Sequence, residues 1–162
     1  MTVTKVDKDT EKLRMTIVSE FDAPLARVWQ MWANPRLLER WWGPPTYPAT
    51  VVEHDLVPGG TVTYFMTGPT GDQPKGWWRV QAVEVPRLLA FVDGFADDAG
   101  TPNPDMPITT IEARLEQLPG GGTRMSIATT FASLDNMEQL IAMGMEEGMS
   151  LALGQIDALL AA

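Results

Sequence analysis

The sequence predicts an α+β fold in which a curved antiparallel sheet wraps around a long C-terminal helix, with two short helices after the first strand. Three observations predict it: a strand that leads into two short helices, a series of strand-like runs separated by turn residues, and a long apolar stripe at helical spacing near the C-terminus. Hairpin spacing without intervening helices favours antiparallel pairing over βαβ units. The helix stripe and one face of the sheet would then bury each other.

The N-terminal residues predict a polar tail followed by a strand. Residues 1–12, MTVTKVDKDTEK, are polar and charged and lack the apolar segment of a signal peptide. From Leu13 to Phe21 apolar and polar side chains alternate, which is typical of a half-buried strand. We therefore expect a tail over residues 1–12 and a single domain over residues 13–162.

Two short helices are expected directly after this strand, within the run FDAPLARVWQMWANPRLLERWWG. Pro24 suits the first position of a helix because the N–H that proline lacks would have no partner there. Asn34 is a good N-cap in front of Pro35, and Gly43 suits the residue after a helix end. The first helix is thus predicted from Pro24 to Asn34 and the second from Pro35 to Gly43.

Six further strands are expected in the middle of the chain. Turn residues separate them, most clearly Pro58-Gly59-Gly60 and the proline with three glycines at 119–122, and glycine supplies the positive φ that such turns use. The predicted strands run from Thr50 to Leu56, Thr61 to Thr67, Trp77 to Val85, Leu88 to Phe95, Ile108 to Leu118 and Thr123 to Phe131.

The last 27 residues predict a helix from about 136 to 160 with a kink near Gly144. Asp135 and Glu138 resemble a capping box at its start, and the apolar residues beyond them fall close to helical spacing. Gly148 and Gly154 lie inside this stretch, where each glycine costs about 1 kcal/mol against alanine. They indicate either close approach to the sheet or room for a ligand.

Composition excludes several classes of function. Twelve Lys and Arg against 21 Asp and Glu give a net charge of −9, so the surface repels nucleic acid and anionic membranes. One histidine and no cysteine argue against a zinc site with three or four ligands, and we expect no metal and no cofactor. No apolar run approaches the roughly 20 residues that span a bilayer, so we expect no membrane insertion. The absence of cysteine is consistent with a cytoplasmic protein.

Several strings in the sequence resemble a known family. They are FDAPLARVW, ERWWGP, the Pro58-Gly59-Gly60 turn and the ending GMEEGMSLALGQIDALL. Together they are similar to the helix-grip proteins of the START/Bet v-like SRPBCC superfamily, which includes lipid-transfer domains, polyketide cyclases and the birch-pollen allergen. Within it the chain resembles the AHSA-type branch, named after the activator of the heat-shock chaperone ATPase. The resemblance spans residues 13–160 and departs at Met149, where members often carry tryptophan.

The fold places a candidate pocket between the C-terminal helix and the sheet. Most of the six tryptophans are expected in the core, with one or two in a pocket lining, because aromatic side chains dominate such linings. His54 is expected to be a hydrogen-bonded core or surface residue, and the alternative is a polar handle or proton acceptor in the pocket. The candidate ligand-binding residues, chosen by strand parity and residue type, are Trp32, His54, Tyr64, Trp78, Phe91, Phe95, Met145 and Met149.

Three functions remain open from the sequence. The leading hypothesis is a protein that binds a small apolar or aromatic molecule, as a monomer or a homodimer. The resemblance also implies an enzyme of the polyketide cyclase or lyase type, in which His54 with Tyr64 or Arg79 would be the polar set. The third hypothesis is a co-factor of the chaperone ATPase. No residue is assigned a catalytic role.

Overall fold

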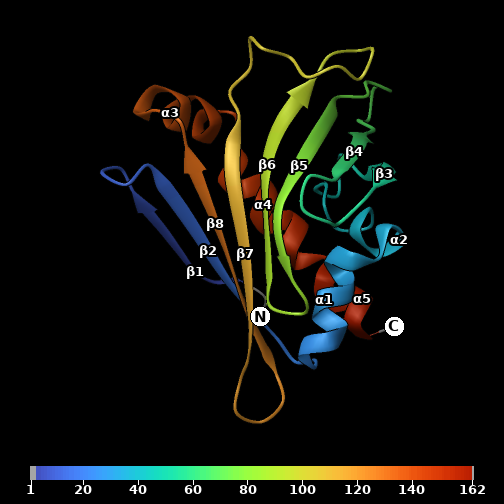
Figure 1. Ribbon diagram of the computed structural model, residues 1–162, viewed down its shortest axis with the longest axis vertical. Coiled ribbons are helices and arrows are strands. Elements are labelled where there is room, and N and C mark those ends of the chain that lie inside the picture. Colours follow the sequence, from blue (N-terminus) through green and yellow to red (C-terminus); the bar gives the residue numbers. More distant parts are fainter. Residues whose placement is uncertain (1–2, 162) are drawn as a thin grey trace.

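The computed structural model describes residues 3–161, which form one eight-stranded antiparallel sheet that curves around the C-terminal helices (Figure 1). The strands lie in the order β1-β2-β8-β7-β6-β5-β4-β3. Their bounds are β1 Val3–Asp9, β2 Arg14–Phe21, β3 Ala49–His54, β4 Thr61–Met66, β5 Lys75–Glu84, β6 Leu88–Ala96, β7 Thr109–Gln117 and β8 Thr123–Phe131. The predicted fold class is confirmed.

The two short helices after β2 are confirmed, with a shorter second helix. The helix α1 is Leu25–Ala33 and α2 is Pro35–Leu38. The side chain of Asn34 accepts a hydrogen bond from the Arg36 backbone N–H at 2.9 Å, which is the N-cap geometry that the sequence indicates. Beyond Leu38 the chain continues in turns.

The prediction of a loose polar tail is wrong for Val3–Asp9, which form the edge strand β1 and pair with β2 along its length. Only Val3 and Val6 of this strand pack against the core. An edge strand is held mainly by backbone hydrogen bonds to one neighbour, so it needs little apolar content and leaves a weak sequence signal. Lys8 also donates to Glu146 at 2.6 Å and so connects β1 to the C-terminal helices.

The C-terminal helix is divided into α3 (Leu134–Ala142), α4 (Met145–Gly154) and α5 (Ile156–Ala161). The first break lies where the sequence indicates a kink: Gly144 has φ +91°, a left-handed conformation that glycine adopts without strain. The cap differs from the expected Asp135 and Glu138 box. The side chain of Ser133 accepts from the Asn136 N–H at 3.1 Å, so the helix starts earlier than predicted.

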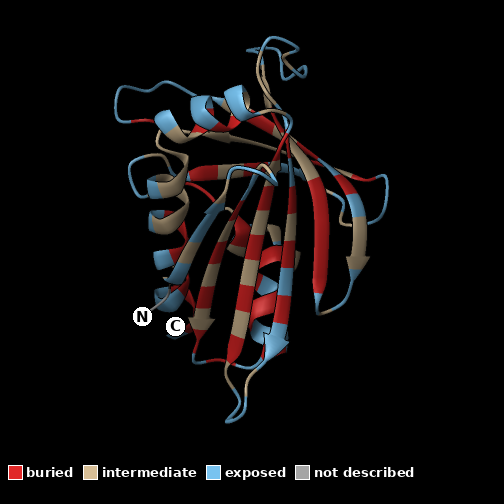
Figure 2. Cartoon of the chain, turned by 90° about the vertical axis from the view of Figure 1, so that its left-hand side faces the viewer, coloured by how far each residue is buried: buried red, intermediate tan, exposed pale blue. Residues whose placement is uncertain are grey.

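The core lies on the concave face of the sheet. Figure 2 shows buried and less buried residues alternating along the strands, as the period of two requires. Every second residue of β2 and β8 is buried against the helices. This alternation also sets which side chains of β4, β5 and β6 face the C-terminal helices.

Candidate functional site

A cluster of aromatic rings fills the part of the concave face next to α1 and α2. Trp32 lies edge-on to Trp41 with ring centroids 4.8 Å apart, and Trp42 is edge-on to Trp78 at the same distance. Trp78 in turn stacks on Phe91 with centroids 4.0 Å apart. These five residues, which we call the aromatic cluster, are buried. They therefore fill this part of the concave face with side chains.

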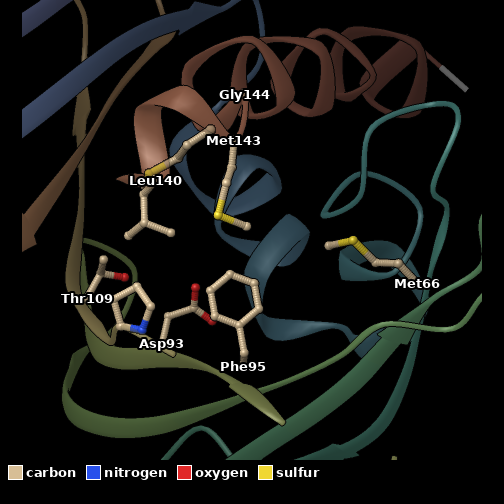
Figure 3. Close-up of a pocket in the computed structure, with 9 residues that line it drawn as sticks. Met66, Asp93, Phe95, Thr109, Leu140, Met143 and Gly144 are labelled. Atoms are coloured by element: carbon tan, nitrogen blue, oxygen red, sulfur yellow. The ribbon is translucent and has the colours of Figure 1, made fainter. Parts of the chain in front are cut away.

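A cavity of about 300 Å³ remains at the other end, beneath the break between α3 and α4 (Figure 3). This volume is at the lower end of the range for small-molecule sites. Its walls are mostly apolar, and three of its nine lining residues are methionines. The lining residues are Met66, Asp93, Phe95, Pro107, Thr109, Leu140, Met143, Gly144 and Met145.

Asp93 places a carboxyl group among these apolar walls. It lies on β6 between Phe91 and Phe95, and period-two alternation puts all three on the concave face. In the ladder Asp93 is opposite Trp78 of β5 and opposite Thr109 of β7. Figure 3 shows its carboxyl group beside Phe95, with Leu140 and Met143 on the facing helix.

Tyr64 of β4 reaches across β5 to this carboxyl group. Its hydroxyl donates to Oδ1 of Asp93 at 3.1 Å. The residue between them is Gly76, and a Cβ there would lie 2.3 Å from Cζ and Oη of Tyr64. Glycine at position 76 therefore gives the tyrosine ring the space that it occupies.

Burial changes the acidity of both groups. Desolvation raises the pKa of Asp93 from 3.8 to about 7, against the opposing hydrogen bond from Tyr64. Desolvation also raises the pKa of Tyr64 well above its ordinary value, and the nearby Asp93 charge adds to the effect. Near neutral pH the site thus holds a neutral phenol and a carboxyl group that exchanges its proton readily.

Two indole N–H groups lie behind this pair. Those of Trp42 and Trp78 are buried and have no hydrogen-bond partner of normal geometry among the described residues. They are nevertheless close enough to act on it, because both lower the pKa of Tyr64 and Trp78 also lowers that of Asp93. Neither indole belongs to the nine residues that line the pocket, so both act on the Tyr64–Asp93 pair from behind it.

The structure brings three of the candidate ligand-binding residues to this site. Phe95 and Met145 line the pocket, and Tyr64 contacts it through Asp93. Met149 is half-buried and packs against the core outside the lining.

The other four candidates do not belong to the lining of the cavity. Trp32, Trp78 and Phe91 are fully buried in the aromatic cluster. His54 has its Nε2 2.9 Å from the carbonyl oxygen of Trp32, which is the hydrogen-bonded arrangement that the sequence favours for a lone histidine. Arg79, considered as part of a polar set, is exposed on the outer face.

Sequence reasoning missed the polar centre of the pocket. Asp93 is a single acidic residue in the run LLAFVDGFA, with inward parity shared by Phe91 and Phe95, and that signal was available. Met66, Thr109 and Leu140 were missed for a different reason. Which inward residues remain uncovered depends on how the large rings pack against one another.

The described residues contain neither a side-chain cluster suited to hold a metal ion nor a helix suited to cross a membrane. Among residues 3–161 no group of three or more His, Cys, Asp or Glu side chains is arranged to hold a metal ion. No described helix has both the length and the apolar character needed to cross a membrane.

The curved sheet, the C-terminal helices and the pocket between them define a helix-grip protein. The family model of Activator of Hsp90 ATPase homolog 1-like proteins matches residues 22–161, and the chain belongs to this family. This confirms the AHSA-type resemblance within the SRPBCC superfamily.

Solved structures extend the likeness over nearly the whole chain. A protein from Mycobacterium smegmatis is 50% identical with a TM-score of 0.90, covering 98% of this chain and 96% of its own. One from Arthrobacter aurescens is also 50% identical, with a TM-score of 0.95 and coverage of 99% and 92%. A protein from Staphylococcus epidermidis is 26% identical with a TM-score of 0.84 and coverage of 98% and 94%. No curated protein matches the sequence.

Proposed function

We propose that the chain binds a small apolar or aromatic molecule in the pocket beneath the α3–α4 break. The observation that carries this proposal is a cavity of about 300 Å³ with apolar walls and one polar centre at Asp93. Ligand sites in proteins combine these two properties, because apolar walls supply affinity and a few polar groups fix orientation. Methionines in the wall suit this role, since their flexible thioethers adapt to ligands of different shape.

A second candidate function is proton-transfer catalysis on the bound molecule. It is favoured by the pKa of Asp93, which burial raises to about 7. A general acid or base works best when its pKa is near the operating pH. Asp93 would exchange the proton, and the Tyr64 hydroxyl would hold the carboxyl group in place. In this function Asp93→Asn abolishes turnover of a bound substrate while binding persists.

The co-factor hypothesis takes third place. The family description names a chaperone ATPase activator, and this chain shares that family. The apolar pocket supports ligand binding more directly than it supports a protein interface. Saturable binding of the chaperone by the purified chain would reverse this order.

Binding is tested by thermal unfolding in the presence of a library of lipids, aromatic metabolites and polyketide-like compounds. A ligand present at 100 times its dissociation constant stabilises a protein by about 2.7 kcal/mol, which is readily measured. Two matched variants locate the site. Met143→Trp fills the mouth of the pocket, and Leu151→Trp adds the same bulk on α4 outside it, at positions that are 57% and 58% exposed.

We expect saturable stabilisation of the wild type and of Leu151→Trp, and a reduced effect in Met143→Trp. Circular dichroism is the suitable readout, because an added tryptophan changes the intrinsic fluorescence. Equal ligand effects in both variants would place binding elsewhere, and no stabilisation by any compound would overturn the proposal.

A further inference from the structure

We propose that the pocket selects hydrophobic amines, bound as monocations with Asp93 as their counter-ion, over fatty acids and other apolar anions. This inference rests on the proposed binding function and specifies the chemical class of the ligand. Three features of the pocket support it: the charge of the lining, the unoccupied acceptor oxygen of the Asp93 carboxyl group, and the apolar and aromatic side chains of the walls.

The lining carries one ionisable group, and that group is acidic. Among the nine described residues that line the cavity there is no Lys, Arg or His, and Asp93 is the one titratable side chain. An apolar acid would enter without a cation to receive it, and its carboxylate would meet a second carboxyl group. Like charges at short range disfavour ionisation of both partners. The lining therefore disfavours apolar anions.

The carboxyl group has an unused position that an ammonium group fits. Tyr64 donates to Oδ1 of Asp93, and the described residues place no donor of normal geometry on Oδ2. Figure 3 shows the carboxyl group directed into the cavity. An ammonium group has several N–H donors and a positive charge, and a charge-assisted hydrogen bond is about twice as strong as a neutral one.

An amine would also remove the energetic cost of ionising Asp93. A carboxylate buried without a positive partner is expensive, and the group responds by retaining its proton. Pairing with a cation compensates for the desolvation of both charges. Ionisation of Asp93 is therefore unfavourable in the empty pocket and becomes favourable when a cation binds beside it.

The side chains of the pocket walls and the net charge of the protein also favour a cationic ligand. Phe95 lies two residues from Asp93 on the same strand face, and an aromatic ring near a cation contributes an attractive cation–π interaction. The polarisable sulfur atoms of Met66, Met143 and Met145 complete the surroundings. A net charge of −9 attracts cations and repels anions at long range.

The test uses three probes that share one apolar body: phenylbutylamine, phenylbutanol and phenylbutyrate. Isothermal titration calorimetry of the wild type at neutral pH should give an affinity for the amine about tenfold or more above that for the alcohol, a difference of about 1.4 kcal/mol. Phenylbutyrate should bind most weakly. In Asp93→Asn the amine should lose this advantage while the alcohol retains its affinity. Asp97→Asn, in an exposed loop, is the matched control and should behave as wild type.

A second readout needs no variant. The groups around the carboxyl are Tyr64 from β4, Trp78 from β5, Thr109 from β7 and the uncharged side chains of the α3–α4 junction. Tyr64 stays neutral because its pKa is raised, and a simple amine stays protonated below about pH 9. As the pH is raised toward neutrality, affinity for phenylbutylamine should therefore increase about tenfold per pH unit, because Asp93 must release its proton to pair with the amine. Above neutrality the affinity should level off. Phenylbutanol should show no such rise.

The outcomes separate this inference from the proposed function. If the alcohol or the acid binds as tightly as the amine, the pocket binds ligands but the preference for cations is wrong. If no probe binds and the library also produces no stabilisation, the binding function itself fails. An amine affinity that is flat with pH or unchanged in a folded Asp93→Asn protein would also overturn the role of Asp93 as counter-ion.

Discussion

Asp93 shows how one half-buried side chain can couple the stability of this fold to pH. Its carboxyl group lies among apolar residues, accepts one hydrogen bond from Tyr64 and has a pKa of about 7. In the unfolded chain the same group has an ordinary pKa near 3.8. This difference links folding to proton binding, and the direction of the linkage follows from the shift.

We expect the free energy of unfolding to decrease as pH rises from about 4 to about 7. Within this interval the unfolded chain has released the proton that the folded chain retains, so rising pH favours unfolding. Asp93→Asn should remove this slope and, at about pH 8, stabilise the protein by at most about 4 kcal/mol, because the shift from 3.8 to about 7 spans about three pKa units of about 1.4 kcal/mol each. Urea denaturation at several pH values checks this. An identical pH slope in the variant would contradict it.

Whether the position of a residue could be predicted from the sequence depended on the kind of contact it makes. The hydrogen-bonded role of His54 could be anticipated from its apolar neighbours in the sequence. The full burial of Trp78 and Phe91 follows from a stack between them, and a stack between side chains on different strands is not visible in residue type or parity. The cavity is the space that such stacks leave, so its position was not accessible to sequence reasoning.

The C-terminal helices carry glycines with opposite structural roles. Gly144 adopts φ +91° at the break and lines the pocket. Gly148 lies inside α4, and a Cβ added there would meet nothing within 4 Å. From the sequence, such glycines could either allow close approach to the sheet or leave room for a ligand. At Gly148 no neighbour approaches closely, so the position has open space beside it.

Alanine substitutions at these two positions should therefore have opposite effects. Gly148→Ala is expected to stabilise the protein by up to about 1 kcal/mol, because it raises helix propensity without a clash. Gly144→Ala is expected to destabilise it by about 1–2 kcal/mol, because an L-residue is strained in the left-handed region. Thermal denaturation of both variants measures the difference. Equal effects of the two substitutions would show that the break does not depend on glycine.

In the sheet, Gly76 gives a separate test at the level of the element. A Cβ at this position would lie 2.3 Å from the Tyr64 ring, so Gly76→Ala must displace the tyrosine. Overpacking of this kind costs about 1–3 kcal/mol. We also expect the pH dependence of stability to change, because the Tyr64 hydrogen bond to Asp93 is lost. Tyr64→Phe is the control, since it removes the hydroxyl without a clash and should change the pH profile with a smaller loss of stability.

Most elements were predictable because their hydrophobic periods are strong. β8 runs from Thr123 to Phe131 as expected from its strict alternation. β1 was missed because its side chains are mostly exposed, and exposed residues carry no periodic signal. The division of the last helix at Gln155 was also unexpected, because Gly154 before it does not adopt the positive φ that marks the break at Gly144.

At the scale of the molecule, the net charge and the curved sheet act on the ligand together. An excess of nine negative charges produces a field that attracts cations before they reach the pocket. This long-range contribution weakens with salt, whereas contacts inside the pocket are screened much less.

We expect the association rate of phenylbutylamine to fall when ionic strength is raised, while that of phenylbutanol stays nearly constant. Stopped-flow measurement of tryptophan fluorescence is suited to this, because Trp78 is opposite Asp93 in the sheet and Trp42 acts on Tyr64. Parallel salt dependence for the two probes would show that charge steering plays no part.

The separation between the aromatic cluster and the pocket has a consequence for how such proteins can diversify. The cluster occupies one end of the concave face and supplies the packing that keeps the sheet and α1 together. The cavity at the other end is lined in part by residues such as Met66 and Met143, which are not among the buried residues of the core. Substitutions in the lining can therefore change what the pocket accepts at little cost to the scaffold, and descendants of one ancestor can inherit the same architecture while exchanging ligands.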